Sequence, residues 1–196
     1  MKKTKQIVTI FAALALAVTA GLSFAGTKTK AAGSDEFTRT AIEIAADMGY
    51  GWNLGNTMEA TNTWTSNPKV TDFETAWGQP VTTKAMIDGI KKAGFNSIRI
   101  PVSWSNMMSS DGNYTIDASY FKRVDEIISY AFANDMYVII NDHYDGGWWE
   151  HFCGNKRDCM KHYKNMWTQV AGHYKDYSEK LIFESANEEL GDSLKK

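Results

Sequence analysis

An amide and a carboxyl group, Asn187 and Glu188, follow a short apolar run at residues 181–183. Such a run is typical of a strand that is buried on both faces. In an α/β barrel, side chains at the carboxyl end of a strand carry the chemistry. A carboxyl group at the edge of an apolar core is disfavoured as an anion, so we expect Glu188 to act as a general acid. The alternative is that Glu188 stabilises the first turn of a following helix through the helix dipole.

Three other expected strands also end in polar side chains. These are Asn56 and Glu59 after the first strand, Arg99 in the second, and Asp142, His143 and Tyr144 after the third. Because the carboxyl ends of parallel strands share one face, these groups are expected to converge although they are distant in sequence. Each is weak evidence alone, since Asn56 also suits a turn and His143 also suits a core.

Arg99 is the most informative of these residues, because Ile98 and Ile100 flank it in the sequence. Strand alternation points Arg99 away from both isoleucines and into the interior of the array. A buried guanidinium without an anionic partner costs several kcal/mol. Glu184 and Glu188 are candidate partners, but an acid that donates a proton should not also be tied to an arginine. The pairing therefore predicts a second carboxylate near Glu188.

Apolar periodicity predicts helices and strands that alternate along the chain. The helices are expected at residues 38–48, 82–93, 117–134 and 156–177, and the strands at residues 49–56, 95–101, 136–141 and from Leu181 onward. Residues 60–80 lack periodicity and are expected to form a long loop. The alternation implies parallel strands, in a barrel or an open doubly wound sheet. No Gly-x-Gly-x-x-Gly follows the first strand in the fingerprint position, which disfavours a nucleotide-binding sheet.

Residues 1–25 have the layout of a secretory signal peptide. Three lysines precede an apolar run at residues 7–20, and Ser-Phe-Ala at residues 23–25 suits a cleavage site. A membrane anchor is the alternative, but two threonines interrupt the run, which is short for a bilayer. We therefore expect a secreted, extracellular protein with a flexible leader at residues 26–36 and one domain from residue 37 to residue 196.

The composition favours a sugar partner over nucleic acid or membrane. The chain has 21 basic and 23 acidic residues, and 18 basic residues remain once the three signal-peptide lysines are removed. A mildly acidic balance argues against a nucleic acid or an anionic membrane as the partner. Seven Trp, nine Tyr and nine Phe offer flat faces that suit sugar rings, although a large aromatic core would use them too.

Only two cysteines are present, Cys153 and Cys159. Outside the cell they suit a disulfide that closes a small surface loop, which we favour, although two thiols are also compatible with the sequence. A structural zinc site is poorly supported because no second cysteine pair exists. Nothing in the spacing of the acidic and histidine residues at positions 142–145 requires a metal either.

Four segments resemble the first four strand motifs of glycoside hydrolase family five, the cellulase-type retaining enzymes. They are Gly51–Ala60 (GWNLGNTMEA), Gly94–Trp104 (GFNSIRIPVSW), Val138–Trp149 (VIINDHYDGGWW) and Leu181–Glu189 (LIFESANEE). They occur in the family's order and extend from about residue 38 to the last residue. The resemblance implies an α/β fold, the (β/α)8 TIM barrel, of which this chain supplies roughly the first four βα units. It implies no cofactor and no metal.

The resemblance also implies a role for each polar residue at the strand ends. Glu188 corresponds to the acid/base, and Asn187 to the residue that bonds the sugar 2-hydroxyl. Arg99 corresponds to the arginine that steadies the nucleophile, and His143 to a sugar-binding histidine. Further substrate-binding positions are Asn56, Glu59, Tyr144 and Trp148. Two departures stand out, because Tyr144 replaces a second histidine of the family and Glu189 replaces a common proline.

The family's nucleophilic glutamate belongs to a seventh strand, whereas this chain has four expected strands. Asp142 and Glu184 are carboxyls of the chain itself, but neither lies on the nucleophile's motif. A retaining mechanism needs two carboxyl groups about 5 Å apart. We therefore expect the amino-terminal half of a longer enzyme that is monomeric when complete. The 196 residues alone are expected to be inert and, because of open strand edges, poorly soluble.

The expected function is that of a secreted endo-β-1,4-glucanase acting on cellulose or a related β-glucan. Family members with β-mannanase, xylanase or xyloglucanase activity are the alternatives, and aromatic loops would determine the choice. A non-catalytic carbohydrate-binding fragment is the alternative of a different class. An intracellular nucleotide enzyme is disfavoured by the signal peptide and by the lack of a phosphate loop.

Overall fold

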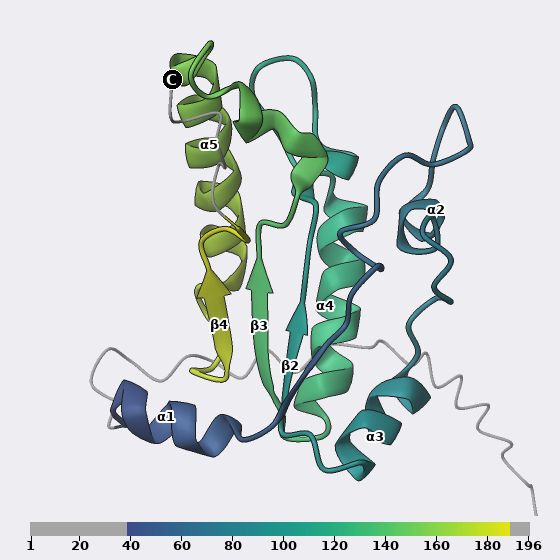
Figure 1. Ribbon diagram of the computed structural model, residues 1–196, viewed down its shortest axis with the longest axis vertical. Coiled ribbons are helices and arrows are strands. Elements are labelled where there is room, and N and C mark those ends of the chain that lie inside the picture. Colours follow the sequence, from purple (N-terminus) through teal and green to yellow (C-terminus); the bar gives the residue numbers. More distant parts are fainter. Residues whose placement is uncertain (1–38, 189–196) are drawn as a thin grey trace, which may run out of the picture.

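The structure is a computed structural model that describes residues 39–188 (Figure 1). The expected signal peptide, the leader and the last eight residues, from Glu189 to Lys196, lie outside this range. Within it the chain folds as an α/β unit whose strands alternate with helices.

Four parallel strands form one sheet in the order β1-β2-β3-β4. They are β1 (Gly51–Asn53), β2 (Ser97–Ile100), β3 (Tyr137–Asn141) and β4 (Leu181–Glu184). An open doubly wound sheet reverses its strand order at a switch point, whereas a barrel adds strands sequentially. The sequential order therefore agrees with the expected barrel geometry, and all four expected strands are confirmed, in shorter form.

The first helix precedes the first strand, and the other helices lie between the strands in the sequence. They are α1 (Ala41–Met48), α2 (Val70–Glu74), α3 (Lys84–Lys92), α4 (Ala118–Phe132) and α5 (Lys156–Tyr174), with 3-10 helices η1 (Trp104–Met107) and η2 (Asp145–His151). Thr83 and Asp117 begin α3 and α4, because each side chain accepts a backbone N–H of the first turn. No helix within residues 39–188 is long and apolar enough to cross a membrane.

The four expected helices are confirmed, whereas the short α2, η1 and η2 were not expected. The first of these lies in the segment that was expected to be a long loop. One or two turns are too short for a clear apolar periodicity, and η2 also contains two glycines with left-handed φ. These three short elements shape the loops at the carboxyl ends of the strands.

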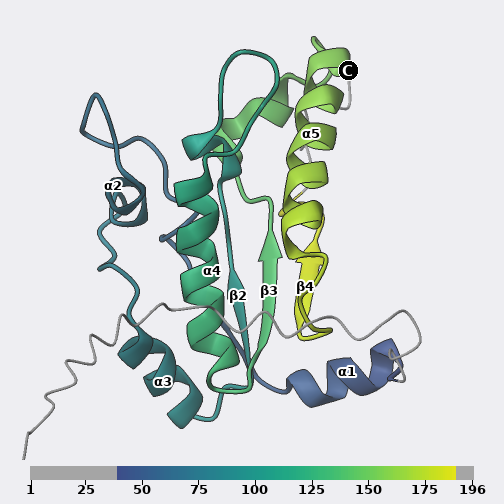
Figure 2. The same cartoon turned by 180° about the vertical axis from the view of Figure 1, so that it is seen from behind.

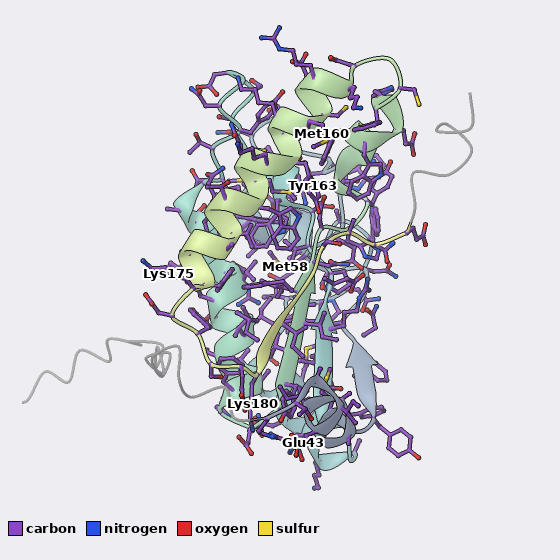
Figure 3. The ribbon with its side chains drawn as sticks, turned by 90° about the vertical axis from the view of Figure 1, so that its left-hand side faces the viewer. Glu43, Met58, Met160, Tyr163, Lys175 and Lys180 are labelled. Carbon is purple, nitrogen blue, oxygen red and sulfur yellow. The ribbon has the colours of Figure 1, made fainter. Side chains whose placement is uncertain are left out.

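Alternate strand residues pack against the helices and form the core. Ile98 and Ile100 of β2 and Val138 and Ile140 of β3 have no exposed surface. Helix α4 packs on this side of the sheet with α5, as the views in Figures 2 and 3 show. The other face of the strands carries polar side chains, among them Arg99, so strand alternation separates the core from the site.

The two ends of the sheet differ in what covers them. Helix α1 lies across the amino ends of the strands (Figure 1), where Arg39 Nη1 donates to the Tyr137 hydroxyl at 2.7 Å and that hydroxyl donates to Asp47 at 2.8 Å. In Figure 3, Glu43 and Lys180 mark this end and Met160 lies toward the opposite one. The carboxyl ends of the strands therefore face the loops that contain η1 and η2.

Candidate functional site

Arg99 connects three strands at their carboxyl ends. Its Nε donates to Glu184 Oε2 at 2.6 Å, and its Nη2 donates to Glu184 Oε1 at 2.7 Å. The guanidinium also donates to Asn53 Oδ1 at 2.9 Å and to Asn187 Oδ1 at 2.8 Å. These bonds place Arg99 on the polar face, as strand alternation predicts. The anionic partner is Glu184, and its hydrogen bonds with Arg99 hold the pKa of that carboxyl below its ordinary value.

Asn141, the last residue of β3, extends this cluster toward His143. Its Nδ2 lies 3.3 Å from Glu184 Oε1 and 3.3 Å from His143 Nδ1, while its Oδ1 accepts the Val102 N–H at 3.2 Å. Burial lowers the pKa of His143, so the imidazole is neutral near pH 7. The sequence reasoning missed Asn141. The signal was present, because a fully buried amide ends a strand that is otherwise apolar.

Asn187 and Glu188 lie directly beyond β4. The Asn187 N–H donates to the Asp142 carbonyl at 2.8 Å, so the segment after β4 is attached to the end of β3. Glu188 is exposed and has a φ of 45°, in the left-handed region. The sequence context predicted that Glu188 lies at the edge of an apolar core. The structure contradicts this, because the residue is exposed. Its charge nevertheless acts on His143, as do those of Glu59 and Arg99.

Glu59 and Asn56 belong to the loop after β1. Glu59 is buried, and its carboxylate accepts the Asn56 N–H at 2.5 Å and the Thr57 N–H at 2.9 Å. Asn56 is exposed with a φ of 62°, a conformation that Asn tolerates in turns. In this structure Glu59 holds the loop backbone, while Asn56 presents its side chain to solvent.

The aromatic residues near the strand ends differ in how far they are available to a ligand. Tyr144 is exposed, and its ring lies 6.5 Å from that of Trp77, which is exposed as well. Trp64 is almost fully exposed at 95%. Trp148 is partly buried, and its Nε1 donates to Asp145 Oδ2 at 2.7 Å. Tyr144 and Trp77 are therefore better placed than Trp148 to form a platform.

Cys153 and Cys159 do not form the disulfide that the sequence analysis favoured. Cys153 is exposed, whereas Cys159 is buried in the first turn of α5, where its Sγ lies 3.5 Å from the Trp148 carbonyl oxygen. The helix thus directs the second thiol inward, toward η2. Within residues 39–188 no three His, Cys, Asp or Glu side chains are grouped so that they could hold a metal ion.

The sequence of this chain is similar to proteins of one enzyme family. The family model for cellulase, glycosyl hydrolase family 5, matches residues 58–195. Endoglucanase A of Paenibacillus barcinonensis is 44% identical over 183 residues, which cover 90% of this chain and 44% of that protein. Endoglucanase A of Clostridium longisporum is 47% identical over 151 residues, which cover 76% of this chain and 29% of that protein.

Solved structures of the same enzyme family are similar to this chain as well. A GH5-4 broad specificity endoglucanase from Ruminococcus champanellensis with bound cellotriose matches with a TM-score of 0.72 and 43% identity, over 76% of this chain and 44% of that one. A variant of a glycoside hydrolase 5 lichenase from Caldicellulosiruptor sp. F32, in complex with cellotetraose, matches with a TM-score of 0.70 and 44% identity, over 76% of this chain and 40% of that one. The chain thus spans less than half the length of these relatives.

Proposed function

The chain belongs to glycosyl hydrolase family 5, the cellulase family, and on this basis we propose that it is the amino-terminal part of a secreted, retaining endo-β-1,4-glucanase. The observation that carries the proposal is the convergence of Arg99, His143 and Asn187 at the carboxyl ends of the strands, with Glu188 beside them. Within the barrel fold, this is the face that carries catalysis. The roles of the individual residues follow from their contacts.

Glu188 is the proposed general acid and base. As an acid it protonates the glycosidic oxygen of the leaving group, and as a base it then activates the water that releases the product. Its exposed position leaves it accessible to a sugar chain. Asn187 turns its amide oxygen to Arg99, which directs its NH2 group the other way, toward a sugar hydroxyl.

A retaining mechanism also needs a nucleophilic carboxylate about 5 Å from the acid. The carboxyls of residues 39–188 that lie near this region are either paired or buried, including Asp145 with 1% exposure. Glu184 is paired with Arg99, Glu59 is buried and holds the loop after β1, and Asp142 has no exposed surface. We therefore assign the nucleophile to another part of a longer enzyme, and the 196 residues alone are expected to be inert.

A β-glucan is the proposed substrate, because the relatives of known structure include complexes with cellotriose and cellotetraose. One relative at 36% identity is a xyloglucan-specific endo-β-1,4-glucanase from Bacteroides ovatus, so a decorated β-glucan is a second possibility within the same backbone chemistry. Mannan and xylan are the remaining alternative substrates. The exposed rings of Trp64, Trp77 and Tyr144 are the side chains through which the chain would distinguish them.

The test uses a chimera, because the chain spans 44% of the Paenibacillus barcinonensis endoglucanase A. The matching segment of that enzyme is replaced by this chain, and hydrolysis is assayed on carboxymethylcellulose, xyloglucan, mannan and xylan. The chimera is expected to hydrolyse the β-glucans. Glu188→Gln should lower kcat by about 10²- to 10⁴-fold, which is the usual contribution of general acid–base catalysis.

Glu179→Gln is the matched control, since Glu179 lies near the opposite end of β4, 3.9 Å from Arg39. It should leave kcat within about twofold, because it lies far from the expected chemistry. Unchanged kcat in Glu188→Gln would remove Glu188 from the mechanism. Cleavage after Ala25, read by amino-terminal sequencing of the exported protein, tests secretion.

The second candidate function is carbohydrate binding without turnover, which the exposed Trp77–Tyr144 pair favours. Titration of the 196-residue chain with cellotetraose distinguishes the two. Binding that survives Glu188→Gln, together with an inactive chimera, would support a binding fragment. Binding together with an active chimera supports the enzyme.

A further inference from the structure

Two buried carboxyl groups lie immediately behind the site. Asp142 has no exposed surface and Asp145 has 1%. Asp142 follows the end of β3 and continues the alternation of Val138 and Ile140, which face the helices rather than Arg99. The proposed reaction uses neither aspartate, so their burial needs another explanation.

Asp145 accepts three hydrogen bonds. The Ser105 N–H donates to Oδ1 at 2.6 Å, the Ser105 hydroxyl donates to Oδ2 at 2.8 Å, and Trp148 Nε1 donates to Oδ2 at 2.7 Å. A carboxylate that receives several donors is favoured as an anion. Burial raises the pKa of Asp145, while these donors lower it, so of the two carboxyls Asp145 is the one whose anion is stabilised by hydrogen bonds.

Asp142 has the opposite environment. Neither of its oxygens accepts a hydrogen bond from an N–H or O–H group of residues 39–188. Its side chain interacts with the Asp145 carboxyl, and two carboxylates can form a hydrogen bond only when one of them holds a proton. Burial, followed by the charge of Asp145, raises the pKa of Asp142 to about 10. Asp142 is the member that keeps the proton.

The same network continues to His162 of α5. Its Nε2 lies 3.1 Å from Ser105 Oγ, and because that hydroxyl gives its hydrogen to Asp145, Nε2 must be the donor. Burial lowers the pKa of His162 to about 4, so this imidazole is neutral. Its ring stacks between Tyr114, at 4.3 Å, and Trp148, at 4.2 Å. His162 therefore donates to the Ser105 hydroxyl, and that hydroxyl donates to Asp145, so Asp145 is the acceptor at the end of this network.

The backbone around Asp145 needs such support. Four consecutive residues have positive φ: Tyr144 at 56°, Asp145 at 49°, Gly146 at 72° and Gly147 at 71°. The first two have side chains, and the left-handed region is unfavourable for them. A strained segment persists only where the surrounding contacts fix it. The contacts of Asp145 with Ser105 hold this segment against η1, and Trp148, which donates to Asp145, packs on His162 of α5.

We propose that Asp142 is a positioning residue, which donates a hydrogen bond from its carboxylic acid to Asp145 and so fixes the loop that carries His143, Tyr144 and Trp148. The inference goes beyond the proposed function, since it concerns how the rim of the site is held and does not depend on the substrate. Asp142 acts through Asp145 and contacts no reacting atom.

The neighbouring titratable groups do not supply a compensating positive charge. Besides His143 and His162, the elements packed around the pair contribute Tyr120 of α4 and Glu59 of the loop after β1. Burial raises the pKa of Tyr120, so the phenol is neutral. Among the ion pairs of residues 39–188, none joins Asp142 or Asp145 to a lysine or an arginine. A proton shared between the two carboxyls neutralises one of their charges instead.

Infrared spectroscopy of the folded 196-residue chain at pH 7 tests the proposal directly. A buried carboxylic acid gives a C=O stretch that is separate from the carboxylate bands and shifts on exchange into D2O. We expect this band in the wild type and its loss in Asp142→Asn. Asp176→Asn, an exposed control, should keep it. A wild-type spectrum without the band overturns the proposal, and this result does not require any variant to fold or any hydrolysis to occur.

Near-ultraviolet circular dichroism tests the positioning role. Asparagine can still donate to Asp145, so Asp142→Asn should retain the tryptophan signal, whereas Asp142→Leu should lose the part that Trp148→Phe also removes. A merely space-filling role predicts that Asp142→Leu keeps the signal as Asp142→Asn does, since leucine fills the space as well. Equal spectra for Asp142→Asn and Asp142→Leu would therefore also overturn the proposal.

Discussion

Arg99 and Glu184 form a two-point ion pair across β3, since they belong to β2 and β4, which do not pair with each other. Strands two places apart are separated by about 10 Å, a span that these two long side chains bridge from either side. The pair is partly buried, with side-chain exposures of 22% and 32%. It ties the edge strand β4 to the middle of the sheet and holds Asn187 in place through the same guanidinium.

Removing the charge of Glu184 should therefore destabilise the fold. Glu184→Gln is expected to lower the free energy of unfolding by about 1–2 kcal/mol, between the values typical of exposed and of buried pairs. Urea denaturation measures this. Lys84→Gln, which breaks the exposed Lys84–Asp88 pair on α3, is the control and should cost less than about 0.5 kcal/mol. Equal losses of unfolding free energy in the two variants would show that the two-point geometry of the Arg99–Glu184 pair adds nothing to stability.

The same pair predicts a dependence on acid. Arg99 lowers the pKa of Glu184 in the folded state, so the unfolded state binds more protons as the pH falls. The stabilisation is present above the unfolded pKa of a glutamate, about 4.3, and is lost as the pH drops through the lower folded value. The difference in stability between wild type and Glu184→Gln should therefore shrink below about pH 4. A constant difference from pH 7 to pH 3 would contradict the assignment.

The sequence predicted the fold better than it predicted the partners within the site. The alternation of Ile98, Arg99 and Ile100 correctly placed the arginine on the polar face, because side-chain direction in a strand follows from local geometry. Which acid would meet Arg99 depends on the register between β2 and β4, through β3, and no local pattern encodes that register. The sequence therefore named Glu184 and Glu188 as candidates and disfavoured Glu188 only because a proton donor should not be tied to an arginine, without identifying Glu184 as the partner.

Burial at the site was also difficult to predict. Glu59 and Asp142 were identified as polar residues at strand ends, and both are buried in the structure, whereas Glu188 is exposed. A residue type and its spacing indicate which face it occupies, but burial depends on which loop folds over it. The loops here contain α2, η1 and η2, which are too short for periodicity to reveal.

The protonated state assigned to Asp142 predicts a dependence on alkali that is opposite in sense to that of Glu184. Its folded pKa is raised to about 10, so the folded state holds a proton that the unfolded state releases near pH 4. The contribution of Asp142 is fully present below the unfolded pKa and is lost as the pH rises toward the folded value. Wild-type stability should therefore fall with rising pH relative to Asp142→Asn, by up to about 1.4 kcal/mol per pH unit. Guanidinium denaturation from pH 5 to pH 9 measures this, and parallel pH profiles would contradict it.

Trp104 connects the core to the site, and its truncation should damage both. The side chain has no exposed surface, packs on Phe121 at 5.4 Å, and donates from Nε1 to the Asn141 carbonyl at 2.9 Å. Trp104→Ala is expected to cost about 3–5 kcal/mol in the free energy of unfolding, as for other large-to-small core changes. Trp104→Phe should cost less, because it mainly loses the hydrogen bond, which contributes about 1 kcal/mol. Thermal and urea unfolding of both variants provide the comparison.

Trp77 should affect sugar binding more than stability, because the residue is 42% exposed and its ring lies beside that of the exposed Tyr144. Trp77→Ala is expected to lower the free energy of unfolding by less than Trp104→Ala does, since part of the Trp77 surface stays in water in the folded state. Its affinity for cellotetraose should fall by about tenfold, the effect of losing one aromatic face that stacks on a sugar ring. Calorimetric titration of the 196-residue chain measures the affinity, with Tyr50→Ala, an exposed aromatic residue directly before β1, as the control. If Trp77→Ala binds like the wild type, the Trp77–Tyr144 pair is not a sugar platform, and substrate contact must come from other residues of the rim.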